Sequence, residues 1–114
     1  MRPGFNGGTH LTIWKFPIPC ELTRGGLLWN PAFCISMPRG AKVLTAQAQF
    51  GMPVIWALVD PNAPVVERAF LMLGTGHDAP TAALEYVGTI QLHDGSLVLH
   101  VFARERLGNF SDSP

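Results

Sequence analysis

The sequence predicts an all-β protein, a small antiparallel sandwich or barrel of about six to seven strands. Two observations support this class. Twelve glycines and ten prolines divide the 114 residues at short intervals, and the apolar stretches between them are too short for most helices but long enough for strands. Four of these stretches also form two hairpins, each with one face that is entirely apolar.

Six strands are expected. Segment 18–42 carries Pro19, Pro31 and Pro38, so we expect a long irregular connection there, with one short strand around 33–36. One helical turn is expected at 79–83. The six strands are Leu11–Pro17, Val43–Phe50, Pro53–Asp60, Val66–Leu73, Leu84–His93 and Ser96–Arg104.

The chain is expected to form a single domain over residues 1–114, with an N-terminal arm (1–10), a β core (11–104) and a C-terminal tail (105–114). It contains no apolar run long enough for a membrane helix, and its glycine-rich start lacks the apolar stretch of a signal peptide. We therefore expect a cytosolic protein in which Cys20 and Cys34 are thiols.

The chain is short of charge. Charged residues make up 14% of it, eight acids and eight bases with a net charge of zero, whereas soluble domains usually carry roughly 25%. A balanced charge argues against binding of duplex nucleic acid through its phosphates. So few charges cover little of the surface, which suggests that a partner, in the first place a second copy of the chain, covers part of it.

The C-terminal hairpin has the stronger turn signal. Asp94-Gly95 between two apolar runs is typical of a type I′ turn. Counting outward from it gives one apolar face, which we expect to face the core. The expected core pairs are Leu92/Leu97, Ile90/Leu99 and Gly88/Val101; the pairs on the other face are His93/Ser96, Gln91/Val98, Thr89/His100 and Val87/Phe102.

The first hairpin is expected to close through a type II′ turn at Gly51-Met52. This register again gives one apolar face. The expected core pairs are Phe50/Pro53, Ala48/Ile55, Ala46/Ala57 and Leu44/Val59; the pairs on the other face are Gln49/Val54, Gln47/Trp56 and Thr45/Leu58.

The second faces of both hairpins lack the Lys and Glu of a normal solvated face. Burying neutral polar groups costs less than burying charges, so we expect these faces to form a subunit interface or to line a ligand groove. Packing under another sheet of the same domain is the alternative. The expected interface residues are Thr45, Gln47, Gln49, Thr89, Gln91 and Phe102.

One loop and one arginine suggest a ligand site. The segment Gly74–His77 follows a strand and can present backbone N–H groups to an anion, although it lacks the lysine of a P-loop; a tight turn is the alternative. Arg68 on the preceding strand suits a phosphate or a salt bridge. The expected ligand-binding residues are Arg68, Gly74, Thr75, Gly76, His77, His93, His100 and Trp56.

No catalytic constellation is recognisable. No serine or cysteine has the flanking residues of a nucleophile motif, and His93 and His100 lie too far apart along paired strands to share a metal ion. A small hydrolase acting through His77 or His93 is the remaining enzymatic reading, but no nucleophile, base and orienting group can be assembled for it. We expect no enzymatic activity, no metal and no cofactor.

Several segments resemble, in order, a small uncharacterised protein family encoded by bacteriophages and prophages. The resemblance covers residues 11–103 and implies a viral context without an established activity. This chain differs in its glycine-rich start, its tail from 105 and a longer connection at 25–33. The matching segments are Thr12–Lys15, Trp56–Pro61, Gly74–His77, Tyr86–Gln91 and Leu97–Phe102.

Together these features predict a phage-encoded, non-enzymatic accessory protein. It would act as a homo-oligomer in the host cytoplasm, where it binds a host factor or sequesters a nucleotide-type defence signal. The alternative is a virion structural protein, a capsid decoration or minor component, whose apolar faces and terminal arms pack against neighbouring subunits. The expected partners are therefore the chain itself, and capsid proteins or a small phosphate-containing ligand, with no membrane and no duplex nucleic acid.

Overall fold

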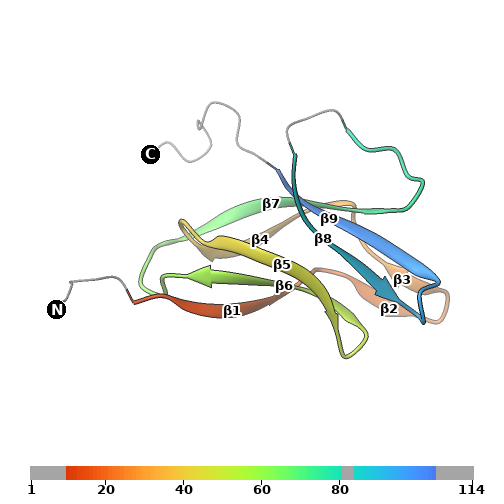
Figure 1. Cartoon of the computed structure of the whole chain (residues 1–114), viewed down its shortest axis with the longest axis horizontal. Helices are drawn as coiled ribbons and strands as arrows, with labels where there is room; N and C mark the ends of the chain where they lie inside the picture. The colour runs from red at the N-terminus through yellow and green to blue at the C-terminus, as the bar shows by residue number, and fades with distance from the viewer. Residues whose placement is uncertain (1–9, 81–83, 105–114) are drawn as a thin grey trace.

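The computed structural model describes residues 10–80 and 84–104. Over these residues the chain forms nine strands in three antiparallel sheets (Figure 1), so the all-β class is confirmed. The described part contains no helix that could span a membrane. The expected terminal arm at 1–9, the expected tail and residues 81–83 of the expected helical turn lie outside the described residues.

Two larger sheets and one small hairpin account for all nine strands. The first sheet has the order β1-β6-β5, the second has the order β4-β7-β9-β8, and β2 pairs with β3 alone. The strands are β1 (Thr12–Pro17), β2 (Glu21–Thr23), β3 (Gly26–Leu28), β4 (Ala32–Pro38), β5 (Lys42–Gln49), β6 (Met52–Val59), β7 (Val65–Gly74), β8 (Leu84–Leu92) and β9 (Leu97–Arg104).

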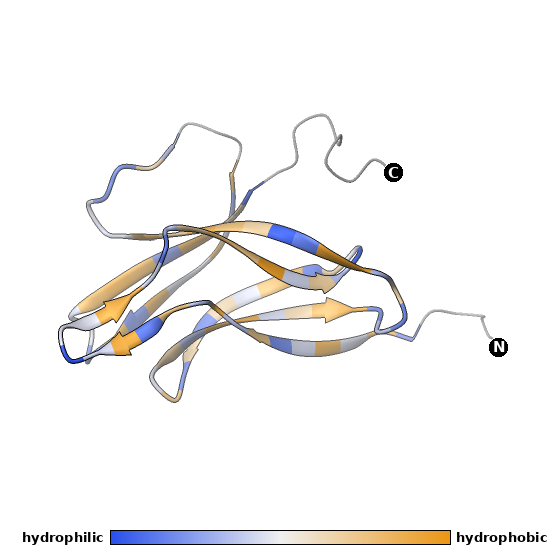
Figure 2. Ribbon diagram, turned by 180° about the vertical axis from the view of Figure 1, so that it is seen from behind, coloured by the Kyte–Doolittle hydropathy of each residue, from blue (hydrophilic) through white to orange (hydrophobic). Residues whose placement is uncertain are grey.

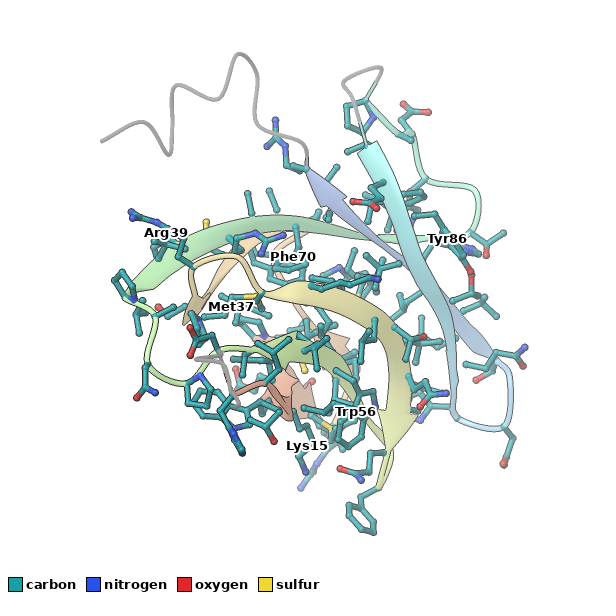
Figure 3. The ribbon with its side chains drawn as sticks, turned by 60° about the vertical axis from the view of Figure 1, so that its left-hand side comes forward. Lys15, Met37, Arg39, Trp56, Phe70 and Tyr86 are labelled. Carbon is teal, nitrogen blue, oxygen red and sulfur yellow. The ribbon has the colours of Figure 1, made fainter. Side chains whose placement is uncertain are left out.

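The two larger sheets form an open sandwich around one core and do not close into a barrel. Phe70 and Met37 from the four-stranded sheet lie between the layers (Figure 3), and Phe70 stacks on Phe33 with ring centroids 5.7 Å apart. Ile55 of the other sheet is also fully buried. Hydrophobic and hydrophilic residues alternate along many strands (Figure 2), which is the pattern of sheets with one buried face.

All six expected strands have both ends within one residue of the expected bounds. Within the expected irregular connection at 18–42, the expected short strand around 33–36 is present as the longer β4, whereas the β2–β3 hairpin was not expected. In the β2–β3 turn, Thr23 Oγ1 accepts a hydrogen bond from Gly25 N and donates one to Gly26 O. These local hydrogen bonds stabilise the hairpin. Its strands therefore need no long apolar run, which is the signal by which strands are recognised in a sequence.

The register of the C-terminal hairpin is confirmed from Gly88/Val101 to Leu92/Leu97. Ser96 N donates to His93 O at 3.0 Å, and Asp94 and Gly95 both have positive φ angles. The expected pair Val87/Phe102 is wrong. A β-bulge between Tyr86 and Gly88 places Tyr86 opposite Phe102, because the bulge inserts one extra residue into β8.

The expected turn of the first hairpin is wrong. The turn is Phe50-Gly51, with φ angles of 52° and 75°, so Gln49 pairs with Met52 and Ala46 pairs with Ile55. Phe50, expected in the core, lies at the tip and is 93% exposed. The register differs from the expected one by two residues, which leaves the same side chains on each face. The observed pairs Ala48/Pro53, Ala46/Ile55, Thr45/Trp56 and Gln47/Val54 replace Ala48/Ile55, Ala46/Ala57, Thr45/Leu58, Gln47/Trp56, Gln49/Val54 and Phe50/Pro53.

A bulge between Val43 and Thr45 corrects the last pair of this hairpin. Val43, not Leu44, follows on the core face and pairs with Ala57. Leu44, expected to face Val59 in the core, is 43% exposed. Bulges at sheet edges redirect side chains in this way.

The two sheets approach each other closely where β5 runs beside β8. Gly88 of β8 lies against the backbone of Ala46, and a Cβ atom on Gly88 would lie 2.7 Å from Ala46 O. Such a distance is too short for a real contact, so this position requires glycine. The two sheets can approach this closely on this side of the sandwich because Gly88 has no side chain.

We predict that Gly88→Ala lowers the free energy of unfolding by about 2 kcal/mol, because the added methyl group overpacks a contact with backbone that cannot move aside easily. Urea unfolding followed by tryptophan fluorescence measures this. Gly25→Ala is the matched control, since its Cβ would meet no atom closer than 3.8 Å. Equal stability of the two variants would contradict the close packing of β5 on β8.

Candidate functional site

The outer face of the four-stranded sheet carries a chain of hydrogen-bonded side chains. The Tyr86 hydroxyl lies 2.6 Å from Thr89 Oγ1, which lies 3.1 Å from His100 Nδ1. His100 Nε2 lies 2.7 Å from Thr75 Oγ1. Four polar side chains from β8, β9 and the end of β7 thus form one continuous network on an open surface.

The strand pairing explains how these side chains meet. Thr89 and His100 are direct partners in the β8–β9 ladder, where opposite side chains on one face lie within contact distance. The β8 bulge adds Tyr86, whose ring packs edge-on against Phe102 with centroids 5.8 Å apart. The result is an exposed surface in which an aromatic pair adjoins three hydrogen-bonding groups.

The side chains of this network can each act as hydrogen-bond donor or acceptor. A neutral histidine has one N–H donor and one acceptor, and a hydroxyl can do both. Both ring nitrogens of His100 have threonine hydroxyls as partners. The ring is therefore held in one orientation from both sides. This arrangement suits recognition of a polar group more than proton transfer to a buried substrate.

The Gly74–His77 segment forms a closed turn. Gly74 N donates to His77 Nδ1 at 3.3 Å, His77 N donates to Gly74 O at 3.1 Å, and Thr75 N donates to Val98 O at 3.2 Å. The imidazole lies over Gly74, where a Cβ atom would be only 3.0 Å from it. Three of the N–H groups expected to bind an anion already have acceptors within the protein, which supports the tight-turn alternative.

Arg68 lies on the core-facing side of β7, in line with Phe70 and opposite Ile35 of β4. Its Nη1 donates to Ala41 O at 2.8 Å. It is separated from Gly74 by six residues of one strand, about 20 Å at the usual rise per residue. The structure therefore does not bring Arg68 together with the Gly74–His77 turn.

The remaining expected ligand residues are also divided. Trp56 lies in the three-stranded sheet (Figure 3), whereas His100 lies in β9 of the four-stranded sheet. His93 is in the exposed turn between β8 and β9. Thr75 is linked to His100 through their side chains, and Gly74 is hydrogen-bonded to His77 within the turn. Ligand binding by these residues stays a prediction.

The six expected interface residues lie on the outer faces of two different sheets. Thr45, Gln47 and Gln49 belong to β5, whereas Thr89, Gln91 and Phe102 belong to β8 and β9. Gln47, Thr89 and Gln91 are exposed, so no other sheet of the described chain covers these positions. The alternative that these faces pack within the domain is therefore wrong for the exposed members.

Sequence reasoning missed two groups of residues. Tyr86 joins the His100 network only because of a bulge, and a bulge has no sequence signal in β8.

A groove beside the β5–β6 turn brings Lys15, Cys20 and Phe50 together from separate elements. Both cysteines are free thiols, as expected, and partial burial raises the pKa of the Cys20 thiol. The sequence signal for this groove was Phe50, an aromatic residue directly before the turn glycine Gly51.

We predict that Thr89→Val lowers the free energy of unfolding by about 1 kcal/mol, because it removes the hydroxyl that joins Tyr86 to His100. It should also release the His100 ring, so that its nitrogen-15 resonances report a mixture of tautomers at neutral pH. Thr45→Val is the control, since the hydroxyl of Thr45 makes only a 3.5 Å contact with Ala46 O. Unchanged His100 resonances in Thr89→Val would contradict the network.

The fold and this surface define an antiparallel β-sandwich protein with open, weakly charged outer faces. Among the described residues, no three His, Cys, Asp or Glu side chains group together as metal ligands. The family model described as Domain of unknown function (DUF7352) matches residues 10–109, and the chain belongs to this family. No curated protein and no solved structure matches the chain.

Proposed function

We propose that this protein is a phage-encoded, non-enzymatic accessory protein that acts as a homo-oligomer and binds a partner protein. The proposed viral context is supported by the sequence resemblance described above. The proposed mode of action is supported by one structural feature, the edge strand β1, which has no second partner strand among the described residues.

Strand β1 pairs with β6 on one side only. Ile13 is 57% exposed and Leu11 is 52% exposed, although both are large apolar residues. Trp14 projects from the core-facing side of the same strand, yet it is 41% exposed. The only charge in β1 is Lys15. Natural proteins usually protect an edge strand by charges, a bulge or a covering segment, so an exposed apolar edge favours pairing with another strand.

A second copy of β1 fits this edge. In an antiparallel pair centred on Trp14, Ile13 of one copy faces Lys15 of the other, so the two lysines do not oppose each other. Pairing would join two three-stranded sheets into one and satisfy the free backbone groups of both edges. By contrast, the edges β5 and β8 lie beside each other and each contains a bulge.

The oligomeric state tests this proposal. We expect light scattering after size exclusion, at micromolar concentration, to give about twice the 12.4 kDa chain mass. Ile13→Lys should give the monomer mass, because it places a lysine opposite Lys15 of the other copy, and these like charges repel. Leu22→Lys is the control, since Leu22 is equally exposed, at 57%, on the separate β2–β3 hairpin. A wild-type protein of 12.4 kDa would overturn the homo-oligomer.

A virion structural protein is the second candidate. Large apolar residues are exposed on elements other than β1, among them Leu22, Leu28 and Val65, and a capsid component with several neighbours needs more than one apolar contact. We expect mass spectrometry of purified virions to find the protein in fixed stoichiometry if it is structural. Its absence from virions would leave the accessory role.

Sequestration of a nucleotide signal receives less support from the geometry. Arg68, far along β7 from the His77 turn, donates to the backbone carbonyl of Ala41, and three of the N–H groups of that turn have acceptors within the protein. For this reason the proposal is directed at a protein partner.

A further inference from the structure

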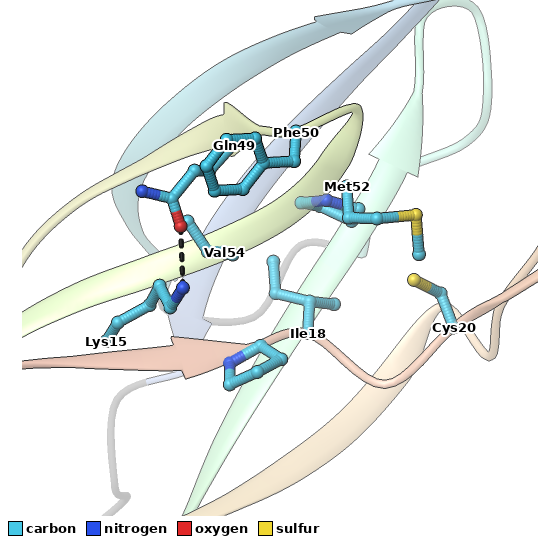
Figure 4. Close-up of a pocket in the computed structure, with 9 residues that line it drawn as sticks. Lys15, Ile18, Cys20, Gln49, Phe50, Met52 and Val54 are labelled. Carbon is cyan, nitrogen blue, oxygen red and sulfur yellow. Dashed lines mark hydrogen bonds between the residues drawn. The ribbon is translucent and has the colours of Figure 1, made fainter.

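A groove lies beside the tip of the β5–β6 hairpin, where it meets the end of β1 (Figure 4). Its volume is about 350 Å³, whereas an apolar cavity of roughly 150 Å³ already holds benzene. The groove is therefore large enough for a bulky side chain. Nine residues line it: Lys15, Pro17, Ile18, Cys20, Gln49, Phe50, Met52, Pro53 and Val54.

The lining combines an apolar floor with one positive end. Ile18, Pro53 and Val54 are buried at the floor, although they lie at the surface end of the sheets. Lys15 Nζ donates to Gln49 Oε1 at 2.6 Å on one side (Figure 4), and no carboxylate is among the nine lining residues. The ammonium group thus faces the groove without an acidic neighbour in the lining.

Phe50 at the rim violates two local preferences. It is 93% exposed, and its φ of 52° is in the left-handed region, which bulky residues rarely occupy. Asparagine or glycine would suit this turn position better. An exposed aromatic side chain on a strained backbone brings no gain in packing to the isolated protein, and such local conflicts concentrate at functional sites.

We propose that the groove binds a linear segment of a partner protein that presents a large apolar side chain within two residues of an aspartate or glutamate. The apolar side chain would enter the groove and contact Phe50, whose aromatic ring is a common anchor at interfaces. The carboxylate would pair with Lys15. An exposed ion pair adds little affinity, so Phe50 supplies most of the binding and Lys15 selects the acidic segment.

This inference rests on the proposed partner binding, but not on the oligomeric state. Lys15 lies on β1 and belongs to both surfaces, but Phe50 lies at the hairpin tip outside the β1 edge, so Phe50 variants test the groove separately from the β1 pairing.

A selection from a random peptide library on the immobilised full chain tests the proposal. We expect enriched peptides with an aromatic residue or leucine next to, or one residue from, Asp or Glu. For a synthetic peptide of the enriched sequence, Phe50→Asn should weaken binding at least tenfold in calorimetry. The same variant should unfold at an equal or higher urea concentration, since asparagine tolerates the positive φ. A loss of function together with a gain in stability separates a binding role from a structural one.

Two further variants sharpen the result. Val65→Asn is the matched control, since Val65 is 66% exposed in the other sheet, and it should bind the peptide within twofold of wild type. Lys15→Glu should turn the selected residue from acidic to Lys or Arg. No enrichment, enrichment of basic peptides by the wild type, or equal binding by Phe50→Asn would overturn the groove as a peptide site. Light scattering on the same samples decides the homo-oligomer independently.

Discussion

The close approach of β5 and β8 determines how the rest of the sandwich is arranged. Gly88 has no side chain, so its backbone can lie against the backbone of Ala46. The two sheets are joined on this side and share the core around Phe70 and Ile55. The opposite edges, β1 and β4, each have only one partner strand. One tight contact therefore leaves the far edge of each sheet available, and the proposed association uses β1, whose large apolar residues Ile13 and Trp14 are exposed.

Two bulges act on the same pair of strands. The bulge in β5 exposes Leu44, and the bulge in β8 places Tyr86 beside Phe102. A bulge increases the local twist of a strand, which lets two edge strands from different sheets run alongside each other without forming a ladder. The two strands belong to separate sheets, and the β8 bulge brings Tyr86 to the His100 surface.

The hairpin predictions from sequence illustrate what periodicity can and cannot decide. Alternation assigned Ala46 and Ile55 to one buried face, and both are buried. It did not assign their register, because a shift of two residues keeps every side chain on the same face. The position of the turn decides the register. In the structure the turn is Phe50-Gly51 and not the expected Gly51-Met52, although phenylalanine disfavours the required φ. For the second hairpin, Asp94-Gly95 agrees with both the turn geometry and the alternation, and its register was correct.

The candidate sites were less predictable than the strands. Thr89 and His100 could be paired from the sequence because they are close to a clear turn, whereas Arg68 and His77 were grouped only because they are near in sequence. Residues along one extended strand move apart by about 3.3 Å each and alternate between faces, so nearness in sequence does not bring side chains together. Phe50, by contrast, is far from Lys15 and Cys20 in sequence but meets them at one groove.

By itself, the sequence determined the all-β class, the bounds of the six expected strands to within a residue and the side of each hairpin that is buried, because turn residues and alternation are local properties. Only the tertiary structure decided which side chains meet across strands and which surfaces stay open. Register, bulges and the contact between sheets depend on packing among distant residues. The shortage of charge predicted that charged side chains cover little of the surface. That exposed apolar side chains lie at β1 and at the β5–β6 tip follows from the topology.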